Sequence, residues 1–162
     1  MRVPGLLSGA DILRHVDDVS AAGVFLRSLE NVHDGGYGVT GFCFGGGIAW
    51  RTGVRDTAAL AVAPYYGIAP PLDEAATATH AAFLGMYGAT DTRINASAGP
   101  LSEAFTANGV WHEMHFYEGA GHAFFNDTGA AYHAASAKDA WVRTVDWFRA
   151  YLPTAIFEEA AA

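Results

Sequence analysis

The sequence has only one cysteine, Cys43, among its 162 residues. A lone cysteine cannot form an internal disulfide, which argues against a disulfide-stabilised secreted scaffold and favours a reducing cytoplasm as the location. It leaves two interpretations of Cys43. The residue is either a small buried apolar side chain or a thiol displayed for chemistry.

Positive charge is also scarce. Nine Lys and Arg residues stand against 17 Asp and Glu residues, for a formal net charge of −8, and the acidic residues are spread along the chain. Nucleic acids and anionic membrane surfaces both require basic patches, so we expect neither as a partner. No apolar run is long enough to cross a membrane, and the N-terminal apolar stretch is too short for a signal peptide. The sequence therefore predicts a soluble cytoplasmic protein.

Apolar residues are abundant, at 51% of the chain against 16% charged residues. This composition and length predict one domain over residues 1–162 with a substantial core. Apolar runs predict strands over residues 37–42, 58–67, 80–88 and 110–118. Helical periodicity predicts helices over residues 11–29, 45–55, 97–109 and about 134–152, and "PPLDEAATA" is expected to be a loop with one helical turn. This alternation is typical of an α/β fold in which helices flank a parallel sheet.

Two of these helices have apolar residues at three- and four-residue steps, which predicts the face that each one buries. Ser8 or Asp11 can cap the start of the first helix. The predicted inner residues are Ile12, Val16, Val19, Leu26 and Leu29 in the first helix, and Trp141, Val145, Phe148 and Leu152 in the last.

Three chemically active side chains follow three of the predicted strands. Cys43 comes directly after residues 37–42, Asp91 lies in "YGATD", and His122 lies in "GAGH". The carboxyl ends of parallel strands meet at one edge of a sheet, so we expect the three side chains to converge. Their order in the chain is nucleophile, acid, histidine. With the nucleophile on a Gly-flanked turn from strand to helix, this is the arrangement of an α/β-hydrolase elbow, with Cys in place of Ser.

Each residue type suits a step of acyl transfer. Gly41 and Gly45 flank the turn, where the crowded backbone is expected to exclude a β-carbon. The helix dipole is expected to favour the Cys43 thiolate. His122 would take and return the thiol proton, and Asp91 would orient the imidazole. The backbone amide of Phe44 would be the first oxyanion-hole donor.

These motifs resemble those of the dienelactone hydrolases, also called carboxymethylenebutenolidases. The resemblance rests on "GFCFGG", "YYG", "YGATD" and "HEMHFYEGAGHAFFN", and it extends from about residue 16 to residue 152. It implies an α/β-hydrolase fold and the hydrolysis of small-molecule esters or enol-lactones without a metal or an organic cofactor. By motif match it also implies Cys43 as nucleophile, Asp91 as acid and His122 as base.

The sequence differs from the family at its start, which lies just before the helix preceding the nucleophile strand. The family's N-terminal strands are missing, and with them a second oxyanion donor, a glutamate that contacts the nucleophile and an arginine that binds the substrate carboxylate. We therefore expect the C-terminal portion of a hydrolase, with one edge of strand 37–42 left open. Such an edge favours self-association with another chain.

Several alternatives remain open from the sequence. Tyr65 and Phe124, with their neighbours Tyr66 and Phe125, either line a pocket for a planar substrate or belong to the core. The chain could instead be a non-catalytic remnant that acts as an interaction module, or a redox sensor that uses the lone thiol. His112 and His115 face opposite sides of one strand and the other histidines lack ligand spacing, so no metal site is expected.

Overall fold

The computed structural model describes residues 11–153. Its centre is a parallel sheet of four strands in the order β1-β2-β3-β4. The strands are β1 (Tyr37–Phe42), β2 (Ala59–Tyr65), β3 (Ala82–Gly88) and β4 (His112–Tyr117). All three pairings are parallel, so all four carboxyl ends lie at one edge of the sheet. The predicted α/β fold with a parallel sheet is confirmed.

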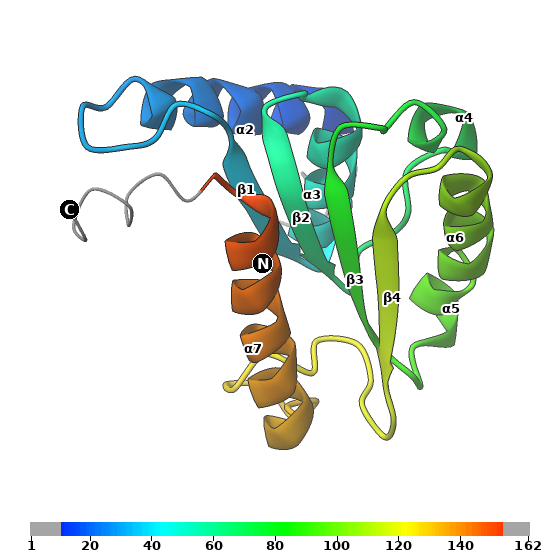
Figure 1. Ribbon diagram of the computed structural model, residues 1–162. Helices are drawn as coiled ribbons and strands as arrows, with labels where there is room; N and C mark the ends of the chain where they lie inside the picture. The colour runs from blue at the N-terminus through cyan, green and yellow to red at the C-terminus, as the bar shows by residue number, and fades with distance from the viewer. Residues whose placement is uncertain (1–10, 154–162) are drawn as a thin grey trace.

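Helices cover both faces of this sheet (Figure 1). Helix α3 (Phe44–Arg55) packs on β1 and β2, and α6 (Ala98–Ala107) packs on β4. Helix α7 (Ala134–Tyr151) lies on the opposite face, over β2 and β3. Helix α2 (Ile12–Arg27) packs against α3, and α4 (Leu72–Ala75) and α5 (Thr92–Asn95) are single turns.

Alternate strand residues supply two separate cores, as expected for a sheet buried on both sides. On the α3 and α6 face, Trp50 stacks on Phe83 with ring centroids 5.6 Å apart, and Phe105 packs beside both. On the α7 face, Leu84 and Trp147 belong to the second core. Every residue of β3 is buried, whereas the outer strands β1 and β4 are partly exposed.

The element boundaries follow the sequence prediction closely. Asp11 caps α2 by accepting a hydrogen bond from the Leu13 amide at 3.0 Å, and Ser8 lies outside the described residues. Gly109, with φ of +69°, follows α6 as the pattern indicated. The predicted single turn in residues 70–78 is α4. Helix α5, directly after Asp91, was not predicted.

The predicted inner faces of two helices are wrong in part. In α2 only Val16 and Gly23 are buried, Leu26 is exposed, and Leu29 lies exposed in the turn after the helix. In α7 the buried residues are Ser136, Ala137, Ala140, Thr144 and Trp147, and Trp141 is 50% exposed. The α7 register is shifted because its inner surface must be flat enough to lie on β2 and β3, and small residues allow that close approach.

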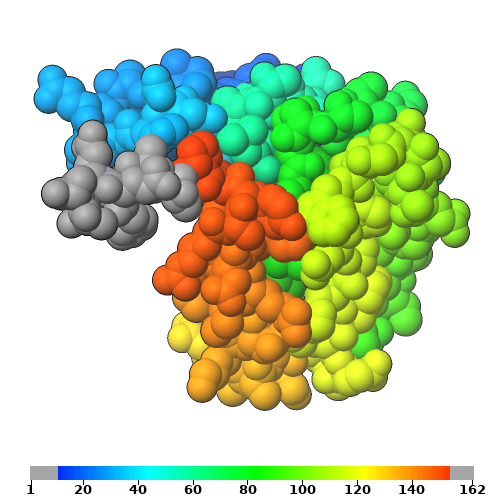
Figure 2. Space-filling view, in the orientation of Figure 1, coloured from blue at the N-terminus to red at the C-terminus, as the bar shows by residue number. Residues whose placement is uncertain are grey.

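Helix α7 leaves part of the sheet uncovered. Figure 2 shows a hollow between α7 and β4, and Leu84, Glu113 and Trp147 are among the residues that line it. Within residues 11–153, no helix is both long and apolar enough to span a membrane.

Candidate active site

The turn between β1 and α3 holds Cys43 in an unusual backbone conformation. Its φ is +54° and its ψ is −115°, and the amide of Cys43 donates to the carbonyl of Tyr65 at 3.1 Å. Positive φ is costly for a residue with a side chain and persists only where the surroundings impose it. The predicted strand-to-helix corner at Cys43 is therefore confirmed as a strained turn.

The two glycines that flank this turn have different roles. A β-carbon at Gly41 would lie 2.2 Å from the carbonyl oxygen of Gly45, which is far inside contact distance. A β-carbon at Gly45 would meet nothing within 4 Å. The expectation that the turn excludes a β-carbon on both sides holds for Gly41 and is wrong for Gly45. On the helix side the crowded position is Gly46, where a β-carbon would lie 2.4 Å from the carbonyl oxygen of Tyr65.

The loops after β3 and β4 are fastened to each other. The Thr90 amide and hydroxyl both donate to the carbonyl of Ala120, at 3.0 and 2.9 Å. A β-carbon on Gly88 would lie 2.4 Å from the carbonyl oxygen of Gly121, so the two backbones are in direct contact. These contacts fix the segment that carries Asp91 against the segment that carries His122.

Asp91 and His122 meet across this junction. His122 Nδ1 donates to Asp91 Oδ2 at 2.6 Å, and the other carboxylate oxygen accepts from the Ile94 amide at 3.4 Å. The Asp91 side chain is only 8% exposed, whereas that of His122 is 36% exposed. The carboxylate fixes the Nδ1–H tautomer, which leaves Nε2 free to accept a proton. Asp91 thus also caps the short helix α5.

The Cys43 thiol is half-buried and lies close enough to Asp91 to be affected by its charge. Burial raises the pKa of the thiol, and the negative charge of Asp91 raises it further. The direction of this shift is opposite to the lowered pKa expected from the position at the start of α3, because both desolvation and a neighbouring carboxylate disfavour the charged form of a thiol. Within residues 11–153, no hydrogen bond joins the thiol to His122.

Tyr66 stands beside both groups. Its ring centroid lies 5.0 Å from that of His122, and with Cys43 it lines a pocket of about 670 Å³. Burial raises the pKa of Tyr66, and the adjacent Cys43 and Tyr65 raise it further, so its hydroxyl stays neutral at physiological pH.

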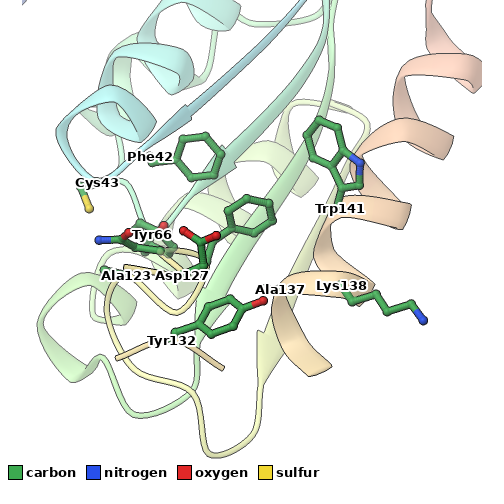
Figure 3. A pocket seen from close by; sticks show the side chains of 11 residues that line it. Phe42, Cys43, Tyr66, Ala123, Asp127, Tyr132, Ala137, Lys138 and Trp141 are labelled. Atoms are coloured by element: carbon green, nitrogen blue, oxygen red, sulfur yellow. The ribbon is translucent and has the colours of Figure 1, made fainter. Parts of the chain in front are cut away.

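This pocket is marked by backbone strain. Three non-glycine residues in the described part of the chain have positive φ, namely Cys43, Tyr66 and Ala123, and all three line it (Figure 3). Strained backbone tends to gather at functional sites, because it is retained only where geometry matters. Half of the remaining lining residues are aromatic, and this part of the lining comes from β1, the loop after β4, and α7. It comprises Phe42, Phe125, Asn126, Asp127, Tyr132, Ala137, Lys138 and Trp141.

Of the two alternatives for Tyr65 and Phe124, the structure supports a place in the core. Both are fully buried, and neither lines the pocket. The Tyr65 hydroxyl donates to the Ala140 carbonyl at 2.9 Å and lies within hydrogen-bond distance of the Thr144 hydroxyl, at 2.7 Å, which ties β2 to α7. Their neighbours Tyr66 and Phe125 line the pocket instead.

Phe42, Tyr132 and Trp141 also line the pocket and were not predicted from the sequence. For Phe42 a signal was present, since the residue preceding a displayed nucleophile at a strand end lies at the same edge. For Trp141 the apolar periodicity of α7 pointed toward the core, and only the packing of α7 shows otherwise. Among residues 11–153, no cluster of three or more His, Cys, Asp or Glu side chains could hold a metal ion.

A parallel sheet with helices on both faces, a strained turn after β1 and an Asp–His pair at the carboxyl edge define an α/β-hydrolase-type protein. The sequence profile of the dienelactone hydrolase family matches residues 6–152. The chain belongs to the dienelactone hydrolase family.

Individual relatives agree with this assignment. The chain is 35% identical over 147 residues to a protein of Methylorubrum extorquens provisionally named carboxymethylenebutenolidase, covering 84% of this chain and 50% of the relative. It is 34% identical over 167 residues to a protein of the same provisional name from Escherichia coli K12, covering 92% of this chain and 60% of the relative.

Solved structures share the fold. A provisionally named dienelactone hydrolase from Klebsiella pneumoniae superposes with a TM-score of 0.81 at 29% identity, over 89% of this chain and 64% of that one. A dienelactone hydrolase-like promiscuous phosphotriesterase from metagenomic libraries gives a TM-score of 0.76 at 18% identity, over 86% and 61%. The chain thus spans between half and two thirds of the length of these relatives.

Proposed function

We propose that this chain carries the thiol-dependent active site of a hydrolase of activated esters and enol-lactones. Cys43 is the nucleophile, His122 the base and Asp91 the residue that orients it. The Phe44 amide, at the N-terminus of α3, is the first oxyanion donor. We further propose that residues 1–162 form one domain that works in the reducing cytoplasm, without a metal or an organic cofactor.

In the proposed reaction, His122 Nε2 takes the thiol proton as Cys43 Sγ attacks the carbonyl carbon. The bond from the carbonyl carbon to the ester oxygen then breaks, and the leaving enol or phenol takes that proton from His122. Water, deprotonated by His122, hydrolyses the thioester. The products are a carboxylic acid and the free thiol.

The raised pKa of the thiol fits this order of events. A resting thiol resists adventitious alkylation and oxidation, since the thiolate is the reactive form. The pair of His122 with Asp91 makes an imidazole that gains stabilisation when it becomes charged. Hydrogen bonds between nucleophile and base are often long in free enzymes and shorten when substrate binds.

One observation carries the proposal: the 2.6 Å bond between His122 and Asp91 lies at the same sheet edge as the strained Cys43 turn. A buried carboxylate that fixes a histidine tautomer, beside a nucleophile held at positive φ, supports acyl transfer more specifically than any single residue does.

Hydrolysis of 4-nitrophenyl acetate tests the proposal. We expect Cys43→Ala to lower kcat/KM by about 10³-fold or more, since removing the nucleophile of such a unit abolishes most of the catalysis. Intact-mass spectrometry of the parent under turnover should show an acetyl adduct on the peptide containing residue 43. Equal rates for the parent and Cys43→Ala would overturn the assignment. They would leave the non-catalytic remnant as the better interpretation, or the redox sensor if the thiol instead formed a reversible sulfenic acid.

A second function, self-association, is favoured by the surface near β1. In the described residues β1 pairs only with β2, so its other edge has no strand partner. Exposed apolar side chains lie at the end of α2 and in the turn that follows it; we call them the α2 patch: Val24, Phe25, Leu26, Leu29 and Val32. A β-carbon on Gly23, in the same half of α2, would lie 2.4 Å from the ring of Tyr37 at the start of β1. The half of α2 that carries the patch therefore packs against the start of β1.

We propose that a second copy of the chain covers this surface. Analytical ultracentrifugation should show a dimer that dissociates on dilution, and Phe25→Glu should shift it to monomer. Val142→Glu, which alters a comparably exposed apolar residue on α7, serves as the control and should leave the dimer intact. A parent that sediments as a monomer over the whole concentration range contradicts this proposal and leaves the catalytic one untouched.

A further inference from the structure

The pocket beside Cys43 contains a row of aromatic rings from three separate elements. Phe42 ends β1 and Trp141 lies on α7 (Figure 3). Phe125, in the loop after β4, lines the same pocket. The centroids of Phe42 and Phe125 are 5.1 Å apart, and those of Phe125 and Trp141 are 6.2 Å apart. The row begins at the residue next to the nucleophile and extends away from it.

Several of the aromatic side chains that line this pocket are substantially exposed to solvent and not packed in the core. Phe42 is 38% exposed, Trp141 is 50% exposed, and Tyr132 on the same pocket is 43% exposed. Contiguous exposed apolar side chains in a concave site favour a ligand that covers them. Aromatic rings bind planar rings in offset or edge-to-face arrangements.

The charged side chains that line the pocket restrict which ligands it can bind. Among its described lining residues, Asp127 is the acidic one and Lys138 the basic one, and no arginine is present. Figure 3 shows the Lys138 side chain extending away from the rings. A carboxylate on the substrate would therefore meet the Asp127 carboxylate and, among these described lining residues, no cation directed at the rings.

We infer that the substrates are uncharged aryl esters, whose planar ring lies against Phe42, Phe125 and Trp141 and leaves as the aryl alcohol. This inference rests on the proposed function. A thiol nucleophile suits such substrates, because an aryl oxide is a stabilised leaving group. Trp141 is then a specificity-determining residue that acts on ring binding and not on the chemistry at Cys43.

Three acetate esters test this inference: 2-naphthyl acetate, its 6-carboxylate derivative and vinyl acetate, which has no ring. We expect Trp141→Ala to lower kcat/KM for 2-naphthyl acetate about tenfold, mainly through KM, because stacking and apolar contact are lost. Vinyl acetate should change less than twofold, and Trp141→Phe should restore most of the loss. Trp111→Ala removes a similarly exposed tryptophan far from the pocket and should change neither ester.

The effect of a negative charge on the substrate is tested by comparing the carboxylate ester with the neutral one. The parent should hydrolyse the carboxylate ester about two- to fivefold less efficiently than the neutral one, a modest factor because Asp127 is exposed to solvent. Asp127→Asn should remove most of that difference. A parent that prefers the carboxylate ester, or a Trp141→Ala variant that slows both acetates equally, overturns the inference while leaving Cys43 as nucleophile.

Binding of the two leaving groups separates this inference from the proposed function, because it requires no turnover. Titration calorimetry should show 2-naphthol binding to the parent more tightly than 6-hydroxy-2-naphthoate, and about tenfold more weakly to Trp141→Ala. If 2-naphthol binds as expected while no ester is hydrolysed, the ring site stands and the proposed catalysis fails. If 2-naphthol does not bind at millimolar concentrations, the ring site fails whatever the esterase activity.

Discussion

Two pockets of similar size lie at different parts of this molecule. One, of about 670 Å³, adjoins Cys43 at the carboxyl edge of the sheet. The other, of about 810 Å³, lies between α2, the end of α3 and α4, and its lining includes four acidic residues: Asp17, Asp56, Asp73 and Glu74. The second pocket is therefore both the larger and the more acidic of the two.

The bonding of their carboxylates separates the two pockets. Asp56 accepts from the Tyr37 hydroxyl and, at 2.9 Å, from the Ala58 amide, so it joins α3 to the start of β1 and β2. Asp91 instead accepts from an imidazole whose other nitrogen is free. The second pocket contains no residue with positive φ in the described chain, whereas the first contains three. The volume and the acidic lining of a pocket therefore indicate a candidate active site less well than strained backbone and an oriented histidine do.

The largest expected effect comes from substituting one key residue in each of the two pockets. His122→Ala should lower kcat/KM for an activated ester by about 10³-fold, since general-base catalysis contributes 10²–10⁴-fold, and should leave the melting temperature nearly unchanged. Asp56→Asn should instead lower the melting temperature and leave kcat/KM nearly unchanged. Initial rates and thermal melts of the same two preparations check this. Loss of activity in Asp56→Asn without loss of stability would break the comparison.

The same Asp56→Asn variant has a predictable pH dependence. Burial alone would raise the pKa of Asp56, but the hydrogen bonds from Tyr37 and Ala58 outweigh it and lower the pKa. This carboxylate therefore stabilises the fold above the unfolded pKa of about 3.9 and loses that contribution as pH falls through the folded value. We expect Asp56→Asn to cost about 1 kcal/mol at pH 7 in urea unfolding and less as the pH approaches 3.

The next effect concerns the strain of the Cys43 turn. Gly41→Ala would place a β-carbon against the Gly45 carbonyl, and should cost about 3 kcal/mol of unfolding free energy. Gly45→Ala meets open space within α3, where alanine favours the helix by up to about 1 kcal/mol, so stability should be equal or higher. Urea unfolding of this matched pair gives the test. Equal destabilisation by both would show that the turn is crowded on both sides.

The smallest effect is on the thiol itself. Because burial and then Asp91 raise the pKa of Cys43, iodoacetamide should label it with a midpoint above the ordinary value of about 8.5. Asp91→Asn removes a negative charge that disfavours the thiolate, so its labelling midpoint should fall toward that value without passing it, since burial remains. A midpoint below 8.5 in the parent would mean that the helix dipole dominates after all.

Much of the fold was predictable because local rules and global packing agree. The strands over residues 59–65 and 82–88 are continuous apolar runs, and such runs fit only a sheet covered on both faces. Their alternation with helices leaves little choice but a parallel order, which places Cys43, Asp91 and His122 at one edge. The family motifs pointed to the same three residues.

The pocket was not predictable in the same way. Tyr65 and Tyr66 are identical in type and adjacent, as are Phe124 and Phe125, yet only the second residue of each pair lines the pocket, although Tyr66 is also buried. Composition cannot separate them, because strand direction and the local backbone at Tyr66 and Ala123 decide which way each ring points. Likewise, the apolar periodicity of α7 does not determine how the helix is rotated about its own axis when it packs on the sheet. In the structure, that rotation leaves Trp141 exposed.

The sequence by itself determined the order of strands and helices, the sharp turn at Cys43 and the spacing that brings an acid and a histidine to the same edge. These depend on period, chain direction and glycine placement, all of which are local. Only the tertiary structure decided that Asp91 holds His122, that burial and Asp91 raise the pKa of the Cys43 thiol, and which aromatic rings remain uncovered. Those outcomes depend on distances between segments far apart in the chain, which packing alone fixes.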